Sequence, residues 1–162
     1  TLFYELVTLH GLDAQARQTL EAAAWLHDIG YAEGYKGHHK AALDFILNTP
    51  QLTLDNKDRL MIGSIARYHR KALPSVKHDH FAALSPVERQ VVCRLASLLR
   101  IADGLDRTHR GRVNGFTVEL NAKKVILHCQ ADTPAELEAD SALKKADLFE
   151  KTFDRKLKIK WD

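Results

Sequence analysis

The spacing of apolar residues changes once along the 162-residue sequence, at Val113. Before Val113, apolar side chains recur every three or four residues, which is the spacing of one face of an α-helix. After it, three short segments alternate between polar and apolar residues, as half-buried strands do: 116–120, 125–129 and 156–161. We therefore predict a mainly α fold, with a helical domain over residues 1–112 and a small α+β appendage over residues 113–162 that contains a hairpin, a helix and a strand.

Capping residues mark where several helices begin. Asp13 precedes an apolar helical stripe, and Ser85-Pro86-Val87-Glu88 is a capping box with proline at the first helical position. Thr133-Pro134-Ala135-Glu136 is a second capping box, which we expect to open one helix through Phe153. Residues 1–9 have helical spacing, and we expect them to be the end of a helix whose beginning is absent from the sequence.

The composition argues against several classes of protein. The formal charge of +3 is too small to indicate DNA binding by itself, and no run of 18 apolar residues predicts a membrane span. Cys93 and Cys129 stand far apart in apolar surroundings, which suggests neither a disulfide framework nor a thiolate zinc site. We therefore expect a cytoplasmic protein with no DNA and no membrane partner. Because the sequence opens with Thr1 and not with Met, we expect it to be a piece of a longer protein.

The dipeptide His27-Asp28 stands at the end of the stripe that follows Asp13, and we expect the helix to end at Gly30. Both side chains fall where the apolar pattern predicts burial, and buried polar groups need partners. A cation is favoured at the C-terminus of a helix. An imidazole nitrogen and a carboxylate oxygen together suit iron, manganese or zinc. The pair is therefore a candidate metal site, the alternative being a simple hydrogen bond between the two side chains.

Further histidines lie at the ends of other predicted helices. His38 and His39 open a helix directly after a glycine-rich loop, and His69 shares the apolar face of a helix that runs from about Asp55 to Arg70. Histidine is the commonest metal ligand, so these side chains are natural further contributions to one site. The alternative for His38 and His39 is a solvated helix start.

Asp103 continues the inward-facing stripe of the helix that starts at the first capping box. A carboxylate in that place is costly unless it is paired or bound to a metal. Metal binding and an ion pair with Arg100 or Arg107 are both consistent with the sequence.

Basic residues surround His69. Arg67, Arg70 and Lys71 are suited to binding phosphate oxygens if a metal lies beside them, although a solvated basic edge is the more ordinary interpretation of each. His78-Asp79-His80 follows in a predicted loop, and we expect it to lie on the surface because no helix or strand fixes its geometry.

Together these residues resemble the pattern of the HD superfamily of metal-dependent phosphohydrolases. Four segments, and the end of the chain at 145–150, are more closely similar to the C-terminal HD domain of the exopolyphosphatase and guanosine pentaphosphate phosphatase (Ppx/GppA) family, in which an actin-like phosphatase module precedes this domain. The four segments are Leu26-His27-Asp28-Ile29-Gly30, Gly37-His38-His39-Lys40, 65–71 and 99–107.

The resemblance implies an HD-type helical bundle and a set of site residues. The implied ligands of a divalent transition metal (iron, manganese or zinc), possibly of two ions, are His27, Asp28, His39, His69 and Asp103. The implied catalytic residues are Asp28, Lys36 and Arg70. The implied phosphate-binding residues are Lys36, His38, Arg70, Lys71 and Arg107.

Three functions follow as hypotheses. The first is metal-dependent hydrolysis of a phosphoester or phosphoanhydride, such as a nucleotide or polyphosphate, with Asp28 bridging two ions. The second is a non-catalytic regulatory domain that binds polyphosphate or a guanosine polyphosphate while an actin-like phosphatase module, in the parent chain or in trans, performs the chemistry. The third is a helical interaction domain whose histidines are structural.

Overall fold

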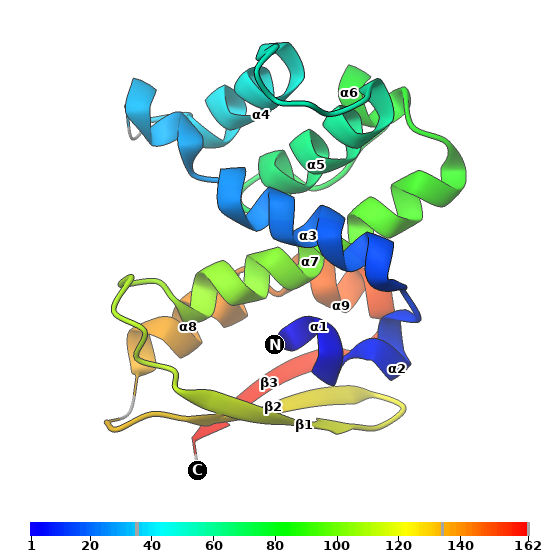
Figure 1. Cartoon of the computed structure of the whole chain (residues 1–162). Helices are drawn as coiled ribbons and strands as arrows, with labels where there is room; N and C mark the ends of the chain where they lie inside the picture. The colour runs from blue at the N-terminus through cyan, green and yellow to red at the C-terminus, as the bar shows by residue number, and fades with distance from the viewer. Residues whose placement is uncertain (35, 134, 162) are drawn as a thin grey trace. The chain divides into compact units, whose positions relative to one another are not determined.

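The computed structural model describes the backbone of residues 1–34, 36–133 and 135–161, and their side chains except that of Glu33. The structure is mainly α with one three-stranded sheet, which confirms the predicted fold class (Figure 1). Contacts group the chain into two compact units. We call Leu12–Leu99 the helical unit, and Thr1–Gly11 with Arg100–Asp162 the α/β unit. The domain boundary predicted at residue 112 was based on the spacing of apolar residues and not on contacts between segments. It stays a prediction. None of the described helices is long and apolar enough to cross a membrane.

The helices of the helical unit begin where their capping residues predict. The Asp13 side chain accepts a hydrogen bond from the Ala16 amide (2.9 Å), and Ser85 and Glu88 cap each other's backbone amides. The elements are α3 (Ala14–Leu26), the 3-10 helix η1 (Ile29–Glu33), α4 (His38–Asn48), α5 (Asn56–Tyr68), α6 (Asp79–Ala82) and α7 (Pro86–Leu105), whose residues up to Leu99 belong to this unit.

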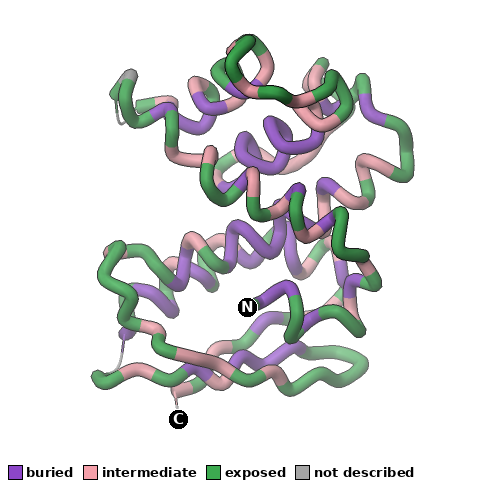
Figure 2. The backbone as a smooth tube through the Cα atoms, viewed as in Figure 1, coloured by how far each residue is buried: buried purple, intermediate pink, exposed green. Residues whose placement is uncertain are grey.

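Helix α5 forms the centre of the helical unit, where it contacts both α3 and α4. Its residues from Met61 to Tyr68 are all buried, as Figure 2 shows by the continuous purple stretch. Arg59, at the start of α5, holds the preceding loop by donating hydrogen bonds to carbonyl oxygens. Its acceptors are Ile46 (2.7 Å), Leu54 (3.2 Å) and Leu52.

The α/β unit contains a mixed sheet in the order β1-β2-β3. The predicted hairpin is confirmed as β1 and β2, which are antiparallel and pair Phe116 with Cys129, whereas β3 is parallel to β2 and pairs Leu157 with Val125. Figure 1 shows the helices of this unit over one side of the sheet. The elements are α1 (Leu2–Glu5), α2 (Val7–His10), β1 (Gly115–Leu120), β2 (Lys124–Gln130), α8 (Glu136–Lys144), α9 (Asp147–Phe153) and β3 (Lys156–Trp161).

The helix predicted from the second capping box to Phe153 is wrong in two respects. It is divided into α8 and α9, because the chain leaves helical geometry at Lys145 and Ala146 is the N-cap of a new helix. In addition, the N-cap of α8 is Ala135, whose side chain makes no capping hydrogen bond. The part of the predicted capping box at Pro134 lies outside the described residues.

Two local predictions in the helical unit are also corrected. Gly30 does not end α3, which stops at Leu26, but lies buried inside η1. His78-Asp79-His80 is not a surface loop, because His78 is the N-cap of α6 and His80 is half-buried. The His80 Nδ1 lies 2.9 Å from the Ser64 hydroxyl of α5, a contact between elements that the local sequence pattern does not reveal.

Candidate metal centre in the helical unit

Three predicted ligands meet where α3 and α5 end. One ligand atom each from His27, Asp28 and His69 lies within 4.8 Å of the other two, which is close enough for a common ion. Among the described residues this is the only group of three or more histidine, cysteine or acidic side chains with such geometry. The His27 Nε2 lies 3.3 Å from the Asp28 Oδ2, and the His69 Nε2 lies 3.9 Å from the Asp28 Oδ1.

His38, the first residue of α4, adds a fourth side chain to this group. Its Nε2 lies 3.4 Å from the His69 Nε2 and 3.6 Å from the Asp28 Oδ1, and its side chain is 1% exposed. The ring of Tyr31 stacks on the His38 ring with centroids 4.0 Å apart. The Arg70 guanidinium approaches the same nitrogen, with its Nη1 3.4 Å away. His38, which we assigned to phosphate, therefore lies where a metal ligand would lie.

Hydrogen bonds to backbone carbonyls decide which nitrogen of His27 and His69 carries the proton. The Nδ1 of His27 lies 2.7 Å from the Ala24 carbonyl oxygen, and the Nδ1 of His69 lies 2.6 Å from that of Ala66. A carbonyl oxygen only accepts, so each Nδ1–H must donate. In the neutral rings the Nε2 lone pairs are then directed to the side of Asp28. Metal-binding histidines are oriented in this way, so the residues present fit a divalent transition metal.

The charge on Asp28 also fits a cation. Partial burial alone would raise the pKa of this carboxyl group. When the histidines are protonated, the hydrogen bond from His27 and the charges of the His27, His69 and His38 rings outweigh burial and hold the Asp28 pKa below its ordinary value. The carboxylate is therefore ionised at neutral pH, as a metal ligand has to be.

His39 lies beside the group but does not join it. Its ring centroid is 6.5 Å from that of His69, and its side chain is buried. Burial, followed by the nearby charge of Arg67, lowers the pKa of His39 to about 4, so the ring is neutral at pH 7. Its buried Nδ1 has no hydrogen-bond partner among the described residues. Buried polar atoms without partners are rare, and this one leaves His39 able to bind a further group.

Close backbone packing sets the position of the His38 side chain. A Cβ atom on Gly30 would lie 2.1 Å from the His38 carbonyl oxygen and 2.8 Å from the Ala42 amide nitrogen, so η1 contacts α4 through bare backbone. Gly37, the N-cap of α4, has φ 89°, a value that glycine adopts without strain. Gly30 thereby allows η1 to pack closely on α4, and Gly37 allows the backbone conformation at the start of α4.

The sequence was also compared with known proteins. Residues 2–152 match the family described as Ppx/GppA phosphatase, domain III. This chain belongs to that family. It is 34% identical over 124 residues to the guanosine-5'-triphosphate,3'-diphosphate pyrophosphatase of Aliivibrio fischeri strain ES114, covering 75% of this chain and 23% of that protein. It is 32% identical over 153 residues to the enzyme of the same name from strain MJ11, covering 93% of this chain and 28% of that protein. The domain III chain thus spans about a quarter of the length of these relatives.

The remaining predicted site residues of this domain III are Asp103, Arg107, Lys36 and Lys71. Asp103 and Arg107 belong to the α/β unit, where Asp103 forms an ion pair with Lys145. Lys36 and Lys71 are exposed residues of the helical unit. Their predicted roles, like the metal role of Asp103, stay predictions.

Arg67 is more deeply buried than the sequence pattern of this domain III predicted. We expected a solvated basic edge, but Arg67 is only 9% exposed. Its buried Nη1 has no hydrogen-bond partner among the described residues. On α5 it stands between Ala66 and Tyr68, which are both fully buried. Its position in this apolar stretch of the sequence was the one indication that the arginine is buried.

Proposed function

We propose that the helical unit binds a divalent transition metal (iron, manganese or zinc) and hydrolyses a phosphoester or phosphoanhydride bond of a nucleotide or polyphosphate. The ligands would be His27, Asp28, His38 and His69, with His39 available for a second ion. The observation that carries the proposal is the fixed tautomer of His27 and His69, since both Nδ1–H groups donate to carbonyl oxygens next to an ionised carboxylate. The resemblance to the HD superfamily supports it.

The metal and the basic residues of the helical unit would have different roles. When bound, the metal acts as a Lewis acid, which activates water near neutral pH and polarises a phosphoryl oxygen. Arg70, which already approaches His38, would neutralise charge on the transferred phosphoryl group. Lys36 and Lys71 are exposed beside the start of α4 and the end of α5, where they would attract the rest of a phosphorylated substrate.

A binding module is the second candidate function. Asp103, an implied metal ligand, is engaged by Lys145, and the chain spans about a quarter of the length of its relatives. In this alternative, the domain holds a polyphosphate or guanosine polyphosphate while an actin-like phosphatase module performs the hydrolysis. The two candidates differ in whether the chain alone needs a metal and releases phosphate.

Metal analysis and a phosphate-release assay on the same purified chain test the proposal. We expect stoichiometric iron, manganese or zinc by mass spectrometry, and release of phosphate from GTP, pyrophosphate or tripolyphosphate. Asp28→Asn keeps the shape of the side chain but removes its charge, so both metal and activity should fall. His109→Ala is the control, because this exposed histidine of the α/β unit should not affect either quantity.

Two outcomes would count against the enzyme. One is a folded chain that takes up no metal even when the metal is supplied in excess. The other is retention of wild-type metal content and phosphate release by the Asp28→Asn variant. Tripolyphosphate binding that survives a chelator, without turnover in any metal, would support the binding module.

A further inference from the structure

The α/β unit contains a close contact between two helices that brings basic residues together. A Cβ atom on Gly104 of α7 would lie 2.4 Å from the Cα of Ala142 in α8, so the two backbones touch at this point. The contacts of Arg100 with Lys145 and of Thr108 with Glu138 show that the two helices run antiparallel at this point. Arg107 and Lys145, which follow the ends of α7 and α8, both line the pocket beside the contact.

A polar stripe on α7 fixes the position of Lys145. Arg100 and Asp103 are three residues apart, so they share one face of the helix. Arg100 donates from Nε to the Lys145 carbonyl oxygen (3.1 Å), and its Nη2 lies 2.7 Å from the Asp147 carboxylate. Asp103 forms an ion pair with the Lys145 ammonium group. Both the backbone and the side chain of Lys145 are thus held by α7.

The residues that follow α7, among them Arg107, are held in place by a contact with α8. The Thr108 hydroxyl donates to the Oε1 of Glu138 at 2.5 Å, which ties the residues after α7 to α8. Glu138 is only 1% exposed, and the hydrogen bond from Thr108 is the main reason why its pKa lies below the ordinary value. The carboxylate therefore remains an acceptor at neutral pH, and Arg107 projects from a fixed backbone.

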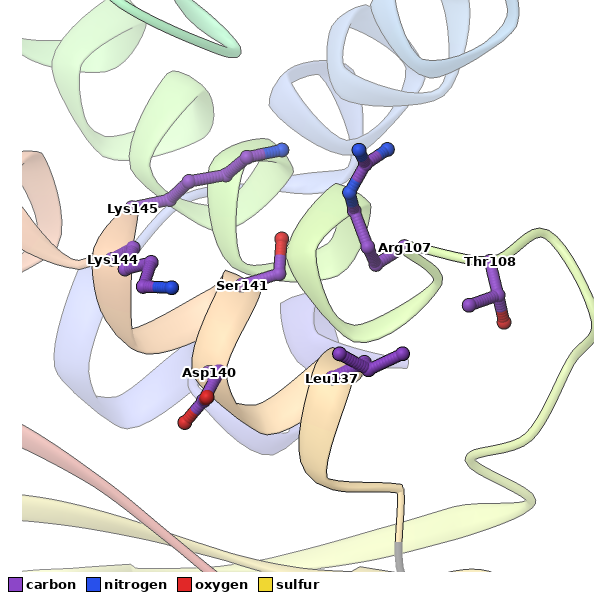
Figure 3. A pocket seen from close by; sticks show the side chains of 7 residues that line it. All are labelled: Arg107, Thr108, Leu137, Asp140, Ser141, Lys144 and Lys145. Carbon is purple, nitrogen blue, oxygen red and sulfur yellow. The ribbon is translucent and has the colours of Figure 1, made fainter.

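These contacts form a pocket of about 570 Å³ within the α/β unit. Figure 3 shows the Arg107 guanidinium and the Lys145 ammonium group extending to the same side, with the Ser141 hydroxyl between their helices. Asp140 and the Lys144 ammonium group lie on the other side of α8 in this view. Two cations and a hydroxyl that converge in this manner suit a tetrahedral oxyanion, because a guanidinium group donates two parallel hydrogen bonds to it.

An apolar side chain lies next to these donors. Leu137 lines the pocket and is 66% exposed, so a ligand in the pocket can cover its side chain. The pocket volume falls within the range of small-molecule sites. A bare phosphate would leave Leu137 in water, whereas a phosphate ester with an aromatic base would cover it.

We propose that this pocket binds a phosphorylated ligand that carries an aromatic or apolar group, such as a nucleotide. Its terminal phosphate contacts Arg107, Lys145 and Ser141, and its base covers Leu137. Asp103 acts as a positioning residue that orients Lys145. The site belongs to the α/β unit and uses no residue of the metal centre, so it does not depend on the proposed hydrolysis.

Calorimetric titration of the full chain with ATP, in the presence of a chelator, tests the site. Arg107→Gln and Lys145→Gln should each weaken ATP binding by about tenfold or more, equivalent to the loss of about 1.4 kcal/mol. Lys158→Gln removes the same charge from an exposed position on β3 and should have little effect. Equal affinities of the Arg107→Gln and Lys158→Gln variants would overturn the proposal.

Leu137→Ser tests the apolar part of the ligand. It should weaken ATP binding and leave the binding of inorganic tripolyphosphate, which has no base, unchanged. Because Leu137 is exposed, this substitution should not disturb folding, and thermal unfolding provides the check. Tripolyphosphate binding as tight as ATP binding, or an unchanged ATP affinity in Leu137→Ser, would refute the role of the base.

Discussion

Gly30 is the residue on which the geometry of His38 depends most directly, because no side chain fits between η1 and α4. Gly30→Ala should force the two segments apart and cost about 1–3 kcal/mol of unfolding free energy, as overpacking does. The displaced His38 should also bind metal less well. Urea denaturation and metal analysis measure the two effects.

Gly63→Ala is the matched control for Gly30. Its added Cβ would meet the Leu43 Cδ1 at 3.0 Å, which is the end of a flexible side chain, whereas at Gly30 the obstacles include backbone atoms. We therefore expect a smaller loss of stability and wild-type metal content. If Gly30→Ala is no less stable than Gly63→Ala, the close packing of η1 on α4 is incorrect.

His80 should make the stability of the chain depend on pH. Burial, followed by the charges of His78 and Arg67, lowers the pKa of His80 to about 4, against the opposing effect of Asp79. An unfolded histidine has a pKa near 6.5, so the folded state is favoured above that pH and loses this advantage as the pH falls towards 4. Unfolding of the wild type should therefore take up protons over this range.

The variant His80→Gln removes this proton while keeping an acceptor for the Ser64 hydroxyl. Between pH 6.5 and 4, its unfolding should take up fewer protons than that of the wild type, by up to about one. Urea midpoints measured across this range give the difference. Parallel pH profiles for the two proteins would contradict the assigned pKa.

The sequence predicted much of the candidate site at the level of single residues, but not all of it. His27, Asp28 and His69 were predicted and lie together, because each follows the apolar face of its helix. Of His38 and His39, it is His38, predicted to bind phosphate, that lies beside Asp28, and the predicted metal role of His39 stays a prediction. They are adjacent in the first turn of α4, and the left-handed conformation of Gly37 sets which of them faces Asp28. The pattern of apolar residues does not show which of these two adjacent histidines points toward Asp28.

Among the elements, the loop between α4 and α5 depends on one arginine. Arg59→Ala would leave the carbonyl oxygens of Ile46, Leu52 and Leu54 without their charged donor. We expect a loss of about 2–4 kcal/mol of unfolding free energy, since hydrogen bonds to charged groups are the stronger ones. Lys57→Ala, which removes an exposed ion pair with Glu88 from the same turn of α5, should cost clearly less. Similar urea midpoints for the two variants would show that the loop does not need Arg59.

Element boundaries were predictable where a local signal sets them. The Ser85–Glu88 capping box is confirmed, since both of its hydrogen bonds form within four residues. The break between α8 and α9 was missed, because the hydrogen bond from Arg100 to the Lys145 carbonyl oxygen spans 45 positions. A contact between residues so far apart in the chain produces no periodic pattern in the sequence.

At the scale of the whole molecule, the sheet depends on its last strand. Leu157 of β3 is 5% exposed and pairs with Val125 of β2. Leu157→Ala should cost about 2–4 kcal/mol, as large-to-small substitutions in a core do, and should speed amide hydrogen exchange in β2. Lys158→Gln, on the exposed face of the same strand, should change neither quantity. Unchanged exchange in the Leu157→Ala variant would argue against this pairing.

The fold class could be predicted from the change of period at Val113, but the grouping into units could not. The spacing of apolar residues indicates single helices and strands. It does not indicate which distant segments of the chain pack together. The inclusion of Thr1–Gly11 with Arg100–Asp162 is such a long-range property.

That grouping has a consequence during translation. Leu12–Leu99 is continuous, so it can fold as soon as it leaves the ribosome, whereas Thr1–Gly11 has to wait until Arg100–Asp162 has been made. Until then the apolar side chains of Leu2, Phe3 and Leu6 remain without their final neighbours. A nascent chain stalled before β3 is therefore the species that chaperones would be expected to recognise.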